Sequence, residues 1–186
     1  MVFEVEKKFQ FLQKEEKDAI MERLSIDAKY IGSKIMHSFI FQAPNYLRVR
    51  LSEHKITVTH KSGEPGDIAR KETDLTLADE QLIPFLSLLE ALGYVSCTHV
   101  MTKRDTFIMD GLTVETNEID GLGFFAEIEG LTENKDEVNS IIQGIDRLKS
   151  RLRLEEVDKS KYKSLLNEFL EKNREVMIPG KILSYL

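Results

Sequence analysis

The segment FEVEKKF, residues 3–9, alternates charged and apolar side chains. A period of two predicts a β-strand, because successive side chains of a strand point to opposite faces. One face of this strand carries Glu4, Glu6 and Lys8, and the opposite face is mostly apolar. In a single strand, such a charged face ordinarily points to solvent. The same alternation recurs along the chain, so the charged faces need a common explanation.

The recurring alternation predicts further strands that each have a polar face. They are expected at about 28–42, 46–52, 55–61, 67–75, 94–109, 112–118 and 124–130, and several are separated by turns containing glycine or proline. Apolar residues with a helical period predict helices at about 13–24, 134–149 and 159–173, and another between a cap at 76–79 and Gly93. The total of about eight strands, with the helices in groups, is typical of an α+β fold.

Short turns between strands predict an antiparallel sheet, and about eight such strands can close into a barrel or tunnel. We therefore expect an eight-stranded antiparallel β-barrel flanked by helices, in a single domain that spans residues 1–186. The predicted helices are amphipathic and need an apolar surface to cover. If they cover the outside of the barrel, the charged strand faces point inward. Such an interior is stable only when its charges compensate one another or a ligand.

The side chains expected inside the barrel follow from their parity along each strand. The basic ones are Lys8, Arg48, Arg50, Lys61, Arg70 and Arg104, and the acidic ones are Glu4, Glu6, Glu72, Glu115, Glu127 and Glu129. Arginine and lysine bind phosphate oxygens, and clustered carboxylates bind Mg²⁺ or Mn²⁺. The interior therefore predicts a polyanionic ligand that carries a divalent cation. The alternative is a structural network of ion pairs, which is costly for so many buried charges.

Composition excludes other classes of function. A formal net charge of −6 argues against a nucleic-acid-binding surface, and no apolar run is long enough for a membrane span. A lone cysteine and a start unlike a signal peptide predict a cytoplasmic protein whose partner is a small molecule. The four histidines lack the spacing of a zinc site. The apolar segment 177–186 packs either on the barrel or on a second subunit, which leaves a homodimer open.

The charged motifs, taken in order, resemble those of the CYTH superfamily, the triphosphate tunnel metalloenzymes. Glu4-x-Glu6-x-Lys8 resembles the ExExK signature of that family, which alone is weak because charged alternation is common. The other motifs that resemble the family are Leu47–Arg50 (LRxR), Thr59–Lys61 (TxK), Arg70–Glu72 (RxE), Thr102–Arg104, the glycine turn 120–123 with Glu127-x-Glu129 after it, and the helix that contains 162–166. The ordered set extends over most of the chain and is specific.

The resemblance implies a tunnel of eight antiparallel strands and a role for each matching residue. The implied metal ligands are Glu4, Glu6, Glu115, Asn117, Glu127 and Glu129. The implied substrate-binding residues are Lys8, Arg48, Arg50, Lys61, Arg70 and Arg104, and the implied catalytic residues are Glu4, Glu6, Lys8 and Glu72. Asn117 stands where class IV cyclases usually have an aspartate, and Ser38 and Ile40 replace the usual aspartate and tyrosine of the second strand.

The resemblance also implies an activity. The favoured one is divalent-metal-dependent hydrolysis of a triphosphate, which could be tripolyphosphate, thiamine triphosphate or a nucleoside triphosphate, with Mg²⁺ or Mn²⁺ as the cofactor. The alternative is a class IV adenylyl cyclase that makes cyclic AMP and pyrophosphate from ATP, and a further one is a non-catalytic module that binds organic phosphates. Hydrolysis is favoured because it demands fewer specialised contacts than cyclisation.

Overall fold

The computed structural model describes residues 3–11, 13–42, 47–53, 55–61 and 69–185, with only the backbone described at 61, 69–71 and 159. Within these ranges the strands form a single antiparallel sheet. The strands are β1 (Phe3–Phe11), β2 (Lys29–Phe41), β3 (Leu47–Ser52), β4 (Lys55–Lys61), β5 (Ala69–Leu77), β6 (Ser96–Met109), β7 (Leu112–Ile119), β8 (Gly123–Thr132) and β9 (Arg174–Val176).

The order β2-β3-β4-β5-β1-β8-β7-β6 is closed by a second pairing between β2 and β6, so these eight strands form a barrel. The closing pairs run from Lys29 opposite Ile108 to Ile40 opposite Thr98. The predicted eight-stranded antiparallel barrel is confirmed. The short strand β9 was not predicted, and it pairs with the first residues of β6 outside the ring.

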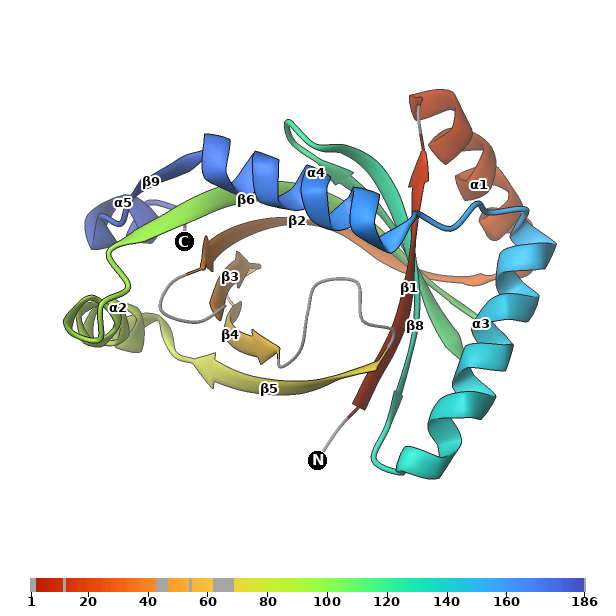
Figure 1. Cartoon of the computed structure of the whole chain (residues 1–186), viewed down its shortest axis with the longest axis horizontal. Helices are drawn as coiled ribbons and strands as arrows, with labels where there is room; N and C mark the ends of the chain where they lie inside the picture. Colours follow the sequence, from red (N-terminus) through yellow and green to blue (C-terminus); the bar gives the residue numbers. More distant parts are fainter. Residues whose placement is uncertain (1–2, 12, 43–46, 54, 62–68, 186) are drawn as a thin grey trace.

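The described part of the chain has five helices, and all but the fourth lie around the outside of the barrel (Figure 1). They are α1 (Lys14–Asp27), α2 (Leu82–Ala91), α3 (Val138–Leu152), α4 (Lys159–Lys172) and α5 (Pro179–Leu183), with 3₁₀ turns at Asp79–Gln81 and Lys135–Glu137. Figure 1 shows α1 and α3 at one side of the molecule, and α2 and α5 at the other. None of the helices in the described part of the chain is long and apolar enough to cross a membrane.

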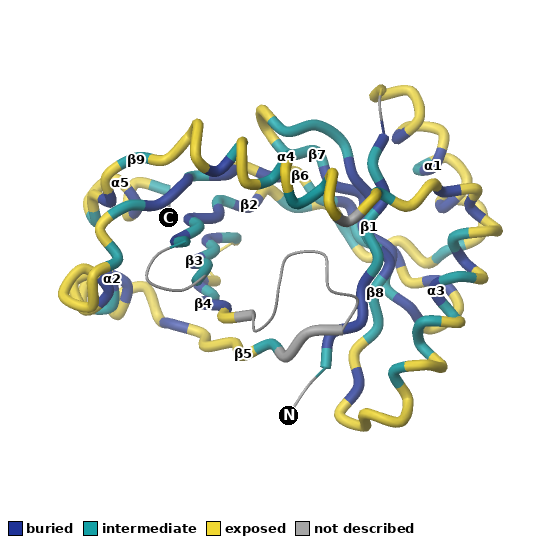
Figure 2. Tube along the Cα trace, viewed as in Figure 1, coloured by how far each residue is buried: buried dark blue, intermediate teal, exposed yellow. Residues whose placement is uncertain are grey.

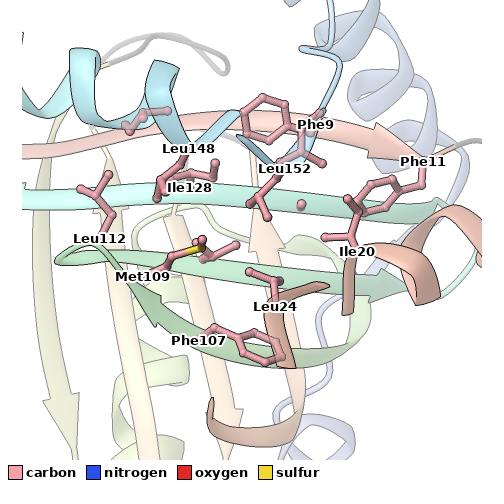
Figure 3. Close-up of a cluster of buried hydrophobic side chains, with 14 of the residues drawn as sticks. Phe9, Phe11, Ile20, Leu24, Phe107, Met109, Leu112, Ile128, Leu148 and Leu152 are labelled. Carbon is pink, nitrogen blue, oxygen red and sulfur yellow. The ribbon is translucent and has the colours of Figure 1, made fainter. Parts of the chain in front are cut away.

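One apolar core lies between α1, α3 and the outer face of the barrel (Figure 3). From β1 it contains Val5 and Phe9, which are on the strand face opposite Glu4 and Glu6, as the alternation predicted. Leu24 of α1 and Leu148 of α3 pack against this face. Figure 2 shows buried and half-buried residues along β1 and β8, while the outward sides of the flanking helices are exposed.

A second apolar core lies under α2 and α5, on the outer face of β2, β3 and β4. Phe39, Val49 and Ile56 contribute from the strands, and Leu86 contributes from α2. The C-terminal segment also belongs to this core, because Met177 and Ile182 are buried in it. Part of the segment 177–186 therefore packs on the barrel, and the homodimer stays a prediction.

Gly130 of β8 tests how closely α3 covers the barrel. A Cβ added at this residue would lie 2.7 Å from Cγ2 of Ile141 and 3.0 Å from Cδ2 of Leu112. Because this contact is too short, we expect Gly130→Ala to lower the free energy of unfolding by about 1–3 kcal/mol in urea denaturation. Gly180→Ala is the control, since nothing lies within 4 Å of a Cβ there. Equal stability of the two variants would mean that α3 does not pack on β8 in this way.

Candidate functional site

A cavity of about 600 Å³ lies inside the barrel, and the inward faces of the strands form most of its wall. Ten of the predicted site residues line it: Glu4, Glu6, Lys8, Arg48, Arg50, Glu72, Arg104, Asn117, Glu127 and Glu129. Glu115 is buried and contacts the guanidinium of Arg104. The side chains of Lys61 and Arg70 are outside the described residues, but the backbone register places Lys61 opposite Glu72 and Arg70 opposite Glu4.

A network of opposite charges runs along the cavity wall from β1 through β8 and β7 to β6. Lys8 contacts Glu127, and its Nζ lies 3.2 Å from Oε2 of Glu6. The other Glu127 oxygen lies 3.1 Å from Nη2 of Arg104, whose Nε donates to Oδ1 of Asn117 at 2.7 Å. Burial disfavours a charged Lys8, yet the carboxylates of Glu127 and Glu6 raise its pKa well above the usual value. These contacts hold the network in its charged form.

Three carboxylates gather at one part of this wall. One oxygen each from Glu4, Glu6 and Glu129 lies within 4.8 Å of the others. Glu6 and Glu129 are direct neighbours across β1 and β8, and Glu4 is on the same face two residues away. Burial and the nearby carboxylates of Glu115, Glu127 and Glu4 raise the pKa of Glu129 to about 8. An all-carboxylate donor set fits a hard divalent cation such as Mg²⁺ or Mn²⁺.

Arginines gather at another part of the wall, on β3. Nη2 of Arg48 donates to Oγ1 of Thr59 at 3.3 Å and lies 3.9 Å from Oε1 of Glu72. Its buried Nε has no hydrogen-bond partner among the residues that the structure describes. Burial, together with the positive charges of Arg48 and Arg104, lowers the pKa of Arg50 to about 9. Crowded guanidinium groups with an unused donor suit a polyanion, because phosphate oxygens accept several such hydrogen bonds.

Residues that were not predicted for the site also line the cavity. Lys34 of β2 is opposite Arg104 in the register, and burial and the Arg104 charge lower its pKa. Its parity matches that of Ser38 and Ile40, so the strand pattern contained the signal for it. Tyr162 contributes from α4, and its ring is 6.1 Å from that of Phe125. No strand pattern could place a helix residue in the cavity.

Comparison with known proteins agrees with this geometry. The protein PH1819 from Pyrococcus horikoshii OT3 has 25% sequence identity, and the match covers 89% of this chain and 99% of that one with a TM-score of 0.74. A "putative adenylate cyclase" from Vibrio parahaemolyticus has 19% identity over 98% of both chains, with a TM-score of 0.60.

The "putative adenylyl cyclase" HpAC1 from Hippeastrum, described as having a dominant triphosphatase activity, has 18% identity over 81% of this chain and 88% of that one, with a TM-score of 0.54. At such identities the Vibrio and Hippeastrum structures show a common fold alone. No curated protein sequence matches the chain. The family model of the CYTH domain matches residues 3–162, which contain all eight barrel strands and every charged motif on their inner faces, and this chain therefore belongs to the CYTH domain family.

Proposed function

We propose that this protein is a divalent-metal-dependent hydrolase of triphosphates, which bind in the cavity of the barrel. The observation that carries this proposal is that like charges gather at separate parts of the wall. Glu4, Glu6 and Glu129 lie together at one part, and Arg48 and Arg50 lie at another. Buried like charges that lie close together repel one another, so each cluster is unfavourable unless a charge of the opposite sign compensates it. Two such clusters suit a ligand that has a cation at one place and anionic oxygens at the other.

We assign Mg²⁺ or Mn²⁺ to the carboxylates of Glu4, Glu6 and Glu129. When bound, such an ion neutralises phosphate charge and lowers the pKa of a bound water. Glu127 and Asn117, which the family resemblance also implies as ligands, accept hydrogen bonds from Lys8 or Arg104 in this structure. Glu115, the remaining implied ligand, is paired with Arg104. We place these three residues second to the trio, because the trio's oxygens lie within 4.8 Å of one another.

We assign the phosphate oxygens to the basic side chains around the cavity. Arg48 and Arg50 would hold the phosphates through charge-assisted hydrogen bonds, and the unused Nε of Arg48 supplies a donor for them. Lys8 and Arg104 would offset the negative charge that develops in phosphoryl transfer. Glu72, close to Arg48, would orient that guanidinium, and its implied catalytic role stays a prediction. The roles of Lys61 and Arg70 as phosphate ligands also stay predictions.

Adenylyl cyclisation is the second candidate, because the cavity has room for more than the phosphates. A volume of about 600 Å³ falls within the roughly 300–1,000 Å³ of pockets that enclose a drug-sized ligand. A cyclase would hold the ribose 3′-hydroxyl of ATP against the α-phosphorus, with the same basic residues around the phosphates. A module that binds organic phosphates without turnover would use these contacts too. The hydrolase, the cyclase and the binding module are therefore distinguished by the products that they form, because all three would use the same phosphate-binding residues.

Incubation with ATP, tripolyphosphate and thiamine triphosphate, each with Mg²⁺ or Mn²⁺, tests the proposal. We expect release of orthophosphate, and we expect Glu4→Gln to reduce the rate about 100-fold or more because the metal site loses a charged ligand. Glu90→Gln, a change at an exposed residue of α2, is the matched control. Cyclic AMP with pyrophosphate would favour the cyclase, and tight binding without any product would favour the binding module.

Glu129→Gln tests the carboxylate trio without an activity assay. Because folding raises the pKa of Glu129 from 4.5 to about 8, the folded state binds this proton more tightly, and stability falls as the pH rises through that range. At pH 9 in EDTA we expect Glu129→Gln to raise the free energy of unfolding by about 1–4 kcal/mol. Added Mg²⁺ should stabilise the wild type more than the variant. Wild-type stability that does not change between pH 5 and 9 would contradict the burial of this charge.

Arg48→Ala tests the assignment of Arg48 to phosphate binding. The variant loses a guanidinium that we assign to substrate binding, so we expect KM to rise about 10- to 100-fold while kcat changes little. Arg147→Ala removes an exposed arginine from α3 and should leave both constants unchanged. An unchanged KM in Arg48→Ala would count against the assignment of phosphates to β3.

A further inference from the structure

Two histidines that are far apart in the sequence lie side by side on the outer face of the barrel, away from the cavity. The pairing of β2 with β6 brings Nδ1 of His37 to 3.1 Å from Nε2 of His99. Both side chains are half-buried, and their neighbours on this face include the apolar residues Phe39 and Leu51. At this distance one ring nitrogen donates a hydrogen bond and the other accepts it, so the contact has room for a single proton.

The last described residue of the chain covers this histidine pair. The ring centroid of Tyr185 lies 4.7 Å from that of His37 and 4.5 Å from that of His99. Tyr185 follows α5, and Ile182 of that helix is buried in the second apolar core. We call residues 174–185, which include β9 and α5, the C-terminal segment. The histidine pair is therefore part of the surface on which the C-terminal segment packs.

The ionisable groups around the pair come from several elements. Burial and the charge of the neighbouring histidine lower the pKa of His99. On the C-terminal segment, Glu175 and Lys181 form an ion pair, so their opposite effects on the pair largely cancel. Asp120, in the turn after β7, favours a charged His99. Lys103, further along β6, is exposed to solvent. The surroundings as a whole therefore favour a pair that is not fully protonated.

We propose that the histidine pair is a pH-sensitive latch, which holds the C-terminal segment on the barrel at neutral pH and releases it under acidic conditions. When both rings are protonated, two N–H groups meet at the contact, the hydrogen bond is lost, and two like charges lie beneath the Tyr185 ring. Once the segment leaves, water hydrates the rings and they are free to turn apart. The released state therefore binds the second proton more tightly, so release becomes more favourable as the pH falls below about 6.5.

The latch is on the outer face and does not depend on the proposed function, but its release would reach the cavity through α4. The strand β9 directly follows α4 in the chain and pairs with the start of β6. The hydroxyl of Thr98, within that pairing, donates to the carbonyl oxygen of Leu170 at 2.7 Å. Phe169, the preceding residue of α4, lines the cavity. We therefore expect that release of the C-terminal segment loosens the end of the helix that lines the cavity.

Cys97, the single cysteine of the chain, can report this release. It is buried, lies opposite Glu175 in the pairing of β6 with β9, and belongs to the second apolar core together with Met177 and Ile182. A pyridyl disulfide reagent can therefore reach this thiol only when the C-terminal segment has left the barrel. The rate of labelling, divided at each pH by the rate for glutathione under the same conditions, measures the released fraction.

We expect the normalised labelling rate of the wild type to rise about tenfold from pH 7.5 to pH 5.5, since uptake of one proton shifts an equilibrium by at most about tenfold for each pH unit. His99→Gln keeps a side chain that can form a hydrogen bond with His37 but cannot become charged. In this variant, and in His37→Gln, the rate should change less than twofold. His60→Gln, at an exposed histidine of β4, is the matched control and should behave as the wild type does.

Three results would overturn the latch. A wild-type rate that stays constant over this pH range would mean that release takes up no proton. An equal rise in the wild type and in both variants of the pair would mean that the proton binds elsewhere. A rise that is accompanied by loss of the β-sheet signal in circular dichroism would mean that the whole barrel unfolds. A rise that both variants abolish, with an unchanged sheet signal, supports the proposal whether or not the protein hydrolyses triphosphates.

Discussion

The apolar faces of the barrel strands point away from the barrel axis, toward the helices, and this orientation leaves the polar faces no place but the interior. On β1, Val5 and Phe9 pack under α1 and α3, so Glu4, Glu6 and Lys8 face the cavity. A shift of one residue in the register would exchange the two faces. The large outward apolar area that α1, α2, α3 and α5 cover therefore stabilises the arrangement in which charges are buried.

This arrangement buries charged side chains around the cavity, and burying a charge costs free energy. Arg104 offsets part of the cost, since it pairs with Glu115 and Glu127 and donates to Asn117, which links β6 to β7 and β8. In the like-charge clusters, burial and neighbouring charges of the same sign raise the pKa of Glu129 and lower the pKa of Arg50. Under the function that we propose, a metal-bound polyphosphate would stabilise both clusters at once.

The helix α4 gives the cavity its second kind of surface. It is tied to β6 through Thr98, and Tyr162 contacts Phe125 of β8 edge-on, so one face of the helix is turned toward the barrel interior. Leu166 and Phe169 on that face add apolar surface to the cavity wall, beyond the apolar surface that the strands contribute. The cavity thus combines charge from the barrel with apolar surface from a helix that follows it in the chain.

Alternation along each strand, short turns between strands and amphipathic helices were enough to predict an antiparallel barrel and the inward direction of residues such as Glu6, Arg50 and Glu127. Strand parity and turn chemistry are local properties of the sequence. Lys34 could have been found in the same way. Other features depend on which strands meet. His37 and His99 seemed scattered, yet the pairing of β2 with β6 brings their ring nitrogens to 3.1 Å on the outer face, beside Tyr185. The strand β9, the docking of Met177 and Ile182, and the apolar residues that α4 adds to the cavity wall likewise arise from contacts between distant segments. Local periodicity predicts which face of a strand each side chain is on. Distances between side chains of different elements depend on which strands pair, and only the tertiary structure determines that pairing.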